Sequence, residues 1–218
     1  MYPRLILSST IRQVPDHQEV YLDKDGFTSI IFDITERVGG PGSSPEIDGR
    51  ALTTHLEDIV DSDDDTVKVW STANTLFSKI SYVTLLPAMI IYGCSYHVQT
   101  SYQPYIGTFI MFMGAALTLS LRPDIPAYTL IATQTPPPAP NSKSPDFTAI
   151  VLTLVRLEKE STDILITINV PHIKGEYTAE EVDLQLGRQG KLIEGAVDYA
   201  ARIWETFKIK DWGLFGEI

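Results

Sequence analysis

The chain has 218 residues, a length that suits one large domain or one domain with an insertion. Hydrophobic residues make up 44 % of it and charged residues 21 %, a composition that supplies a sizeable core and excludes global disorder. The net charge of -11 argues against nucleic-acid binding, which needs clustered Lys and Arg. It is compatible with a basic protein partner, or with solubility alone. The single cysteine, Cys94, allows no disulfide within the chain, which fits the cytosol or the nucleus.

The first third of the chain predicts strands separated by turns, and one helix. Three stretches rich in β-branched and aromatic residues are expected to be strands: residues 19–22, 29–34 and 66–70. Apolar residues recur at helical spacing over residues 48–60, and Asp48 stands where an N-cap is expected. The acidic run 61–65 lacks the glycine and the terminal glutamate of an EF-hand loop, so a solvated loop is expected there.

Residues 80–121 contain no Asp, Glu, Lys or Arg, although the average composition would place about nine charges among these 42 residues. The apolar stretch 105–121 is at the lower limit for crossing a bilayer, which takes roughly 17–25 residues. Three interpretations stay open: a buried insertion, a membrane-inserted hairpin, or a segment foreign to the protein, such as a translated intron. The third is favoured, because residues 75–80 and 123–128 look like two halves of one element that the charge-free run interrupts. One domain over 1–218 is thus expected, with 81–121 an apolar insertion not native to the fold.

The last third predicts strands followed by a helix. The expected strands are residues 127–133, 147–156 and 163–170, and the connection 135–145 carries five prolines. Residues 189–207 hold a continuous apolar stripe at helical spacing. Runs of strands with few intervening helices predict an α+β fold, an antiparallel β-sheet flanked by helices.

No catalytic motif is present. The four histidines are scattered without metal-ligand spacing, and the glycine-rich residues 39–42 lack the Lys-Ser/Thr ending of a phosphate-binding loop. Carboxylates occur in pairs three residues apart: Asp33 with Glu36, and Asp16 with Glu19. Acid–base catalysis would require a pocket and a shifted pKa, and the sequence indicates neither. We therefore expect a protein that is not an enzyme and uses no cofactor and no metal.

Four segments in a fixed order carry a family resemblance. Residues 12–20 read RQVPDHQEV, residues 29–36 read SIIFDITE, residues 55–58 read HLED, and residues 162–171 read TDILITINVP. Together they resemble the Ran guanine nucleotide release factor family, the MOG-type nuclear-import proteins, over roughly 170 residues. There are two departures. Residues 1–10 do not match the family's glycine-rich first strand, and the charge-free run replaces a short connection.

The resemblance implies a curved antiparallel sheet flanked by helices, similar to the PsbP fold. It implies a monomer that binds the GTPase Ran, promotes nucleotide release from it and supports nuclear protein import, in nucleus and cytoplasm. The family's acidic contact maps onto Asp33 and Glu36, and the equally spaced Asp16 and Glu19 are further candidates for Ran binding. The alternative is a membrane-associated PsbP-like binding protein anchored through residues 106–121. A third, weaker alternative is a small-molecule or ion-binding enzyme that uses the acidic loops.

Overall fold

The computed structural model describes residues 5–10, 13–60, 65–80, 82–85, 119–122, 125–137 and 144–215. The chain divides into two compact units, Met1–Ile80 with Ile125–Ile218, and Ser81–Asp124. In the second unit, β5 (Tyr82–Leu85) pairs with β6 (Leu119–Arg122) in antiparallel fashion. Residues 86–118, which hold most of the charge-free run and of the suggested membrane anchor, lie outside the described residues. Among the residues that are described, no helix is long and apolar enough to cross a bilayer.

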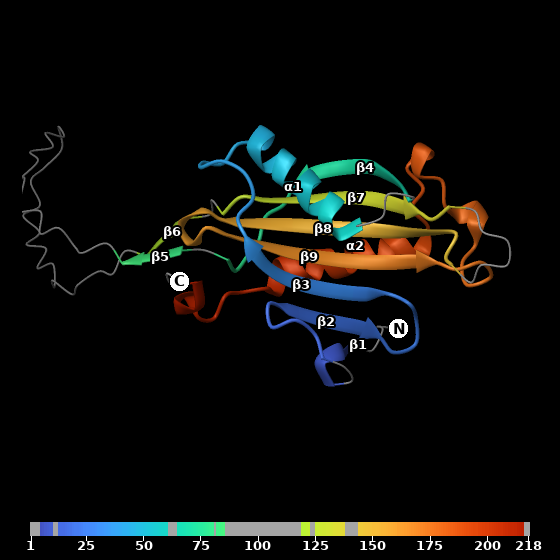
Figure 1. The fold of residues 1–218 in the computed structure, drawn as a ribbon, viewed down its shortest axis with the longest axis horizontal. Coiled ribbons are helices and arrows are strands. Elements are labelled where there is room, and N and C mark those ends of the chain that lie inside the picture. The colour runs from blue at the N-terminus through green and yellow to red at the C-terminus, as the bar shows by residue number, and fades with distance from the viewer. Residues whose placement is uncertain are drawn as a thin grey trace, which may run out of the picture. The chain divides into compact units, whose positions relative to one another are not determined.

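In the described part of the first unit, seven antiparallel strands form one sheet in the order β1-β2-β3-β9-β8-β7-β4 (Figure 1). The strands are β1 (Leu5–Leu7), β2 (Gln18–Asp23), β3 (Ser29–Glu36), β4 (Thr66–Asn74), β7 (Ala127–Thr135), β8 (Phe147–Leu157) and β9 (Thr162–His172). All six predicted strands are confirmed, and each is somewhat longer than its apolar run. β1, which pairs with β2 at the sheet edge, was not predicted.

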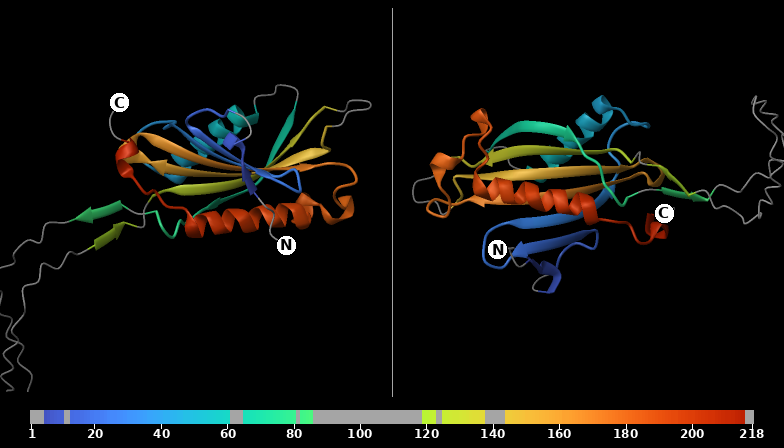
Figure 2. Two further views of the ribbon diagram at one scale, coloured as in Figure 1. Left: turned by 90° about the horizontal axis from the view of Figure 1, so that it is seen from below. Right: turned by 180° about the vertical axis from the view of Figure 1, so that it is seen from behind.

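Two helices cover the two faces of the sheet, α1 (Pro45–Val60) on one and α2 (Gly190–Thr206) on the other (Figure 2). Short 3-10 helices fill several connections: η1 (Ser8–Thr10), η2 (Glu158–Glu160), η3 (Ala179–Glu181), η4 (Leu184–Leu186) and η5 (Trp212–Phe215). The predicted α+β class, an antiparallel sheet flanked by helices, is confirmed.

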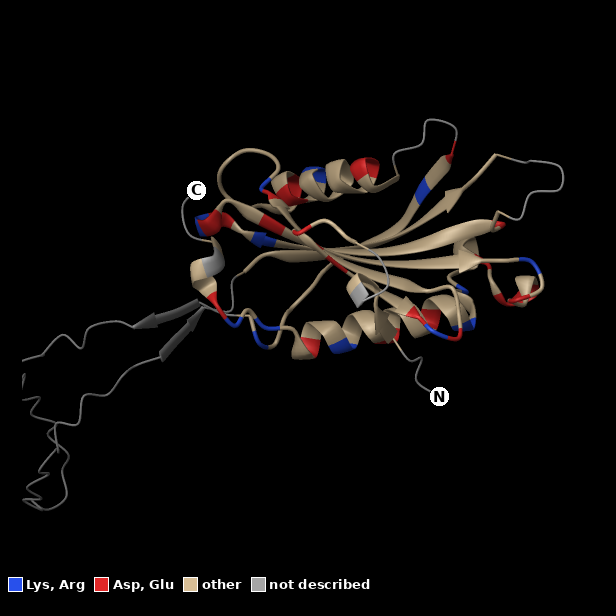
Figure 3. Cartoon of the chain, turned by 60° about the horizontal axis from the view of Figure 1, so that its bottom comes forward, with Lys and Arg blue, Asp and Glu red and all other residues tan. Residues whose placement is uncertain are grey.

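The central strands β8 and β9 are buried on both faces, because each face carries a helix. Successive side chains of a strand point to opposite faces, so Ile150 and Leu152 pack toward α1 while Val151 and Val155 pack toward α2. Each fully buried side chain of this kind contributes about 1.5–3 kcal/mol. Charged residues lie mainly on helices, connections and strand ends, and most of the central sheet is free of them (Figure 3).

Helix α1 begins three residues before the predicted start, at Pro45. The hydroxyl of Ser44 accepts a hydrogen bond from the backbone N–H of Ile47 (3.2 Å), which is the geometry of an N-cap, and proline suits the first helical position. The prediction that Asp48 caps this helix is therefore wrong. Asp48 lies inside the first turn and is fully buried.

Asp48 belongs to a buried charge network that joins α1 to the sheet. The guanidinium of Arg156 donates to Asp48 Oδ1 (3.0 Å), to Asp163 Oδ1 (3.1 Å) and to the carbonyl oxygen of Val38. The other oxygen of Asp163 accepts from the Val38 N–H and lies 3.0 Å from His55 Nε2. Both carboxylates are 0 % exposed, so Arg156 compensates charges that water does not reach.

His172 is the last residue of strand β9, and its environment leads us to predict that the stability of the protein depends on pH. Its ring is buried and stacks on Phe147 with a centroid distance of 4.1 Å, and Nδ1 lies 2.9 Å from the carbonyl oxygen of Val170. Burial lowers the pKa of His172 below its ordinary value of 6.5; the Val170 carbonyl and the charge of Asp146 oppose this shift more weakly. The native state therefore binds fewer protons than the unfolded chain.

Because the folded pKa is depressed, the stabilising contribution of neutral His172 is complete above pH of about 6.5 and is lost as the pH falls through the folded pKa. We expect the melting temperature of the wild type to decrease as the pH is lowered from about 7.5 to about 5.5. The decrease should be smaller in His172→Gln. Thermal melts of both proteins across this range test this prediction. Equal slopes would show that other groups cause the dependence.

Candidate functional site

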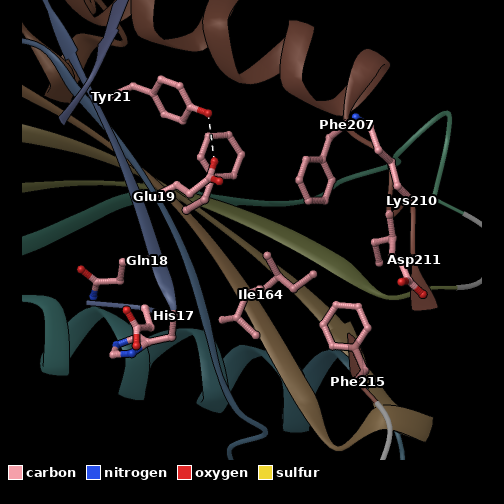
Figure 4. Close-up of a pocket in the computed structure, with 13 residues that line it drawn as sticks. His17, Gln18, Glu19, Tyr21, Ile164, Phe207, Lys210, Asp211 and Phe215 are labelled. Carbon is pink, nitrogen blue, oxygen red and sulfur yellow. Dashed lines mark hydrogen bonds between the residues drawn. The ribbon is translucent and has the colours of Figure 1, made fainter. Parts of the chain in front are cut away.

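A groove lies on the α2 face between strand β2 and the segment after α2, residues 207–215. Its volume is about 490 Å³. Phe32 and Ile34 of β3 and Ile164 of β9 line the groove, and Figure 4 shows Ile164 between Phe207 and the β2 side. The wall opposite β2 is formed by residues of the segment after α2: Phe207, Ile209, Lys210, Asp211 and Phe215.

Aromatic contacts hold this wall against the sheet. Phe207 stacks on Phe32 with a centroid distance of 5.8 Å, and Tyr21 meets Phe32 in a T-shaped contact, also at 5.8 Å. Phe77 and Phe207 form a T-shaped contact with a centroid distance of 6.0 Å. Such pairs contribute about 0.5–1.5 kcal/mol beyond burial, so the groove is built by packed side chains from distant parts of the chain.

The carboxylate of Glu19 is held in place on the β2 wall. Glu19 and Tyr21 lie two residues apart on one face of β2, and the Tyr21 hydroxyl donates to Glu19 Oε2 at 2.9 Å (Figure 4). Burial, and then the hydrogen bond and charge of Glu19, raise the pKa of Tyr21 above its ordinary value of 10.0. The hydroxyl therefore stays protonated and keeps donating to Glu19, which holds the Glu19 side chain at the groove.

The other face of the same strands presents Asp33. It lies with Gln18, His55 and Asp58 around a second hollow, of about 430 Å³, between β3 and the end of α1. Gln18 Nε2 donates to Asp33 Oδ2 (3.0 Å), and His17 Nε2 lies 3.8 Å from Asp33 Oδ1. Because strand side chains alternate, Asp33 and Glu36, three residues apart, point to opposite faces.

The four acidic residues predicted from the sequence thus lie on both faces of the sheet. Asp16 and Glu19 line the groove, Asp33 lies on the α1 face, and Glu36 is exposed at the end of β3. The β2–β3 ladder begins at the pair of Gln18 with Asp33, so residues 34–36 of β3 extend past the start of β2. All four carboxylates therefore gather around one corner of the sheet, where β2 begins and β3 ends.

Sequence reasoning did not assign the groove's far wall. Phe207 ends the stretch 189–207 that was predicted to be a helix, and Phe215 lies beyond it. One local signal was available: Phe207 and Ile209 alternate with lysines directly after the helix, which is typical of a segment with one apolar face. Within the described residues, no group of three or more His, Cys, Asp or Glu side chains is arranged to hold a metal ion.

Comparison with known proteins identifies the family. The family model described as "Ran-interacting Mog1 protein" matches residues 3–171, more than three quarters of the chain. The fold resembles a solved mutant of protein Mog1, with a TM-score of 0.57, 19 % identity, and coverage of 97 % of this chain and 89 % of that chain.

It also resembles the Ran-binding protein Mog1p of Saccharomyces cerevisiae, with a TM-score of 0.51, 20 % identity, and coverage of 91 % of this chain and 81 % of that chain. No curated protein sequence matched significantly. The family model, the order of the elements and the matching structures lead to one conclusion: the chain belongs to the family of Ran-interacting Mog1 proteins.

Proposed function

We propose that this protein binds the GTPase Ran, promotes release of its guanine nucleotide and supports nuclear protein import, acting in nucleus and cytoplasm. Membership of the Ran-interacting Mog1 family carries the proposal. The acidic corner formed by Asp16, Glu19, Asp33 and Glu36 supports it, because it offers a docking surface whose charge fits a basic partner.

The net charge of -11 gives this corner a long-range role. A negative surface raises the rate of encounter with a basic partner and orients it before contact, and salt weakens this steering. Asp16, Glu19 and Glu36 are exposed, so their charges act in solvent and affect association rate more than final affinity.

Release of nucleotide follows if the protein binds nucleotide-free Ran more tightly than loaded Ran. The coupling is reciprocal: the protein lowers the affinity of Ran for nucleotide by the same factor by which nucleotide lowers the affinity of Ran for the protein. Carboxylates near a nucleotide site favour the empty state, because they repel the phosphates and compete for the positive groups that bind them. The protein thus acts as a regulator rather than as an enzyme.

Stopped-flow release of a fluorescent guanine nucleotide from Ran tests the proposal. We expect the protein to raise the release rate and to lower the equilibrium affinity of Ran for the nucleotide by about 5- to 150-fold, as a coupling of 1–3 kcal/mol implies. A second small GTPase loaded with the same nucleotide is the control, and its release rate should not change.

A variant lacking residues 81–124 should act like the full chain. Asn74 pairs with Tyr128, and the N–H of Thr75 donates to the carbonyl of Ala127 (2.8 Å), so β4 and β7 meet directly on both sides of this segment. Shortening the connection also lowers the entropic cost of closing it by about 1–2 kcal/mol. If neither form binds Ran or accelerates release, the proposed function is wrong.

A further inference from the structure

The groove on the α2 face exposes apolar surface that the fold itself does not cover. Ile34 is 45 % exposed, whereas Ile30, on the same face of β3, is 2 % exposed. Phe32, Phe207 and Phe215, which are partly buried, line the same groove, and the buried Ile164 lies beneath it. An apolar concavity rimmed by polar groups is typical of a protein-binding site, since water contact with it is unfavourable.

The charges at the rim specify the kind of partner. Asp16 and Glu19 lie on the β2 side, and Asp211 lies on the opposite wall beside Lys210 (Figure 4). Three carboxylates and one ammonium group thus line the groove, with His17 and Tyr21 on the β2 side. The apolar centre therefore has negative charge on both sides.

We propose that this groove receives an apolar side chain of Ran that is flanked in space by basic residues on both sides. The inference rests on the proposed function and assigns the anchor point of that interaction. The apolar side chain would cover Ile34 and Phe215, and the flanking cations would reach Glu19 on one wall and Asp211 on the other. A buried apolar anchor with a charged rim is the arrangement that dominates affinity in protein interfaces.

The two walls come from distant parts of the chain. Strands β2 and β3 lie within the residues that match the family model, 3–171, and the wall from Phe207 to Phe215 follows them. The stack of Phe207 on Phe32 joins the two parts. The sheet thus supplies one side of the groove, and the C-terminal segment supplies the other side and adds the Asp211 carboxylate.

The test measures Ran binding by Ile34→Thr and a matched control. Threonine keeps the β-branched shape that a strand favours but removes apolar surface. Val69→Thr is the control, because Val69 of β4 is also 45 % exposed and lies on the far edge strand of the sheet. We expect Ile34→Thr to weaken Ran binding about tenfold in a titration, and Val69→Thr to leave it unchanged.

Asp211→Asn provides a second variant outside the sheet. Asparagine keeps a side-chain oxygen that can accept the Gly213 N–H (2.9 Å in the wild type), so the local turn is retained while the charge is removed. We expect about threefold weaker binding at low salt and a shallower dependence of affinity on salt.

The outcomes separate the two proposals. If wild-type protein does not bind Ran, the proposed function fails and the anchor inference fails with it. If wild-type protein binds Ran and both Ile34→Thr and Asp211→Asn bind equally well, the function stands and the groove is not the anchor. Equal weakening by Ile34→Thr and Val69→Thr would also overturn the groove, because it would trace the loss to general surface polarity.

Discussion

Replacing Arg156 with alanine is expected to destabilise the protein by about 3–5 kcal/mol, the largest effect of any single substitution considered. The reason is the burial of its partners: Asp48 and Asp163 are 0 % exposed, and the substitution removes the guanidinium that pairs with both. For a domain of this size the thermal midpoint should fall by roughly 6–20 °C. Differential scanning calorimetry or a circular-dichroism melt measures the change.

Arg50→Ala is the matched control. Arg50 pairs with Glu46 on the same helix, but both side chains are more than 70 % exposed (75 % and 77 %), so water compensates the loss of the pair and the midpoint should change little. An Arg156→Ala midpoint within about 2 °C of the wild type would mean that the two buried carboxylates do not depend on Arg156.

Reversing the charges of Asp33 and Glu36 together, to lysine, is expected to weaken Ran binding at least about 30-fold at low salt. Like charges brought together at an interface cost several kcal/mol, and about 2 kcal/mol corresponds to a 30-fold change. The affinity of the variant should also depend less on salt, because the attraction that salt screens has been removed. Isothermal titration at several ionic strengths measures both effects.

The matched control reverses Glu180 and Glu194, two exposed residues away from the acidic corner, and changes the net charge by the same amount. It should lower affinity far less, through long-range steering alone. Equal effects of the two double variants would show that total charge, not the corner, controls binding. An unchanged affinity for Asp33→Lys/Glu36→Lys would remove these residues from the interface. Melts of both variants confirm that each is folded.

The strands and helices could be predicted because their signals are local. Strands β3, β8 and β9 contain runs of β-branched residues, and α2 contains an apolar stripe. These patterns follow the side-chain periods of 2 in a strand and 3.6 in a helix, which do not depend on the rest of the fold. The three-residue β1 has too few residues to show a period, so its pairing with β2 was not predicted. Because side chains alternate along a strand, the spacing of three residues also predicts that Asp33 and Glu36 point to opposite faces.

Asp48 shows where local reasoning fails. An acidic residue before an apolar helical stripe is typical of an N-cap, yet Ser44 performs that role and Asp48 binds Arg156 instead. These two residues are 108 positions apart, and Arg156 lies in an otherwise apolar strand. No property of either segment alone indicates that the other compensates its charge.

The sequence by itself determined the α+β class, the antiparallel sheet with its flanking helices, and the acidic residues that carry the family resemblance. Only the tertiary structure decided that Asp16 and Glu19 face an apolar groove, that Asp33 lies on the other side of the sheet, and that residues 207–215 form the opposite wall. The physical reason is distance along the chain. The pattern that indicates a strand or a helix is contained in neighbouring residues. The groove instead depends on packing between segments that are far apart in the sequence, such as Phe32 and Phe207.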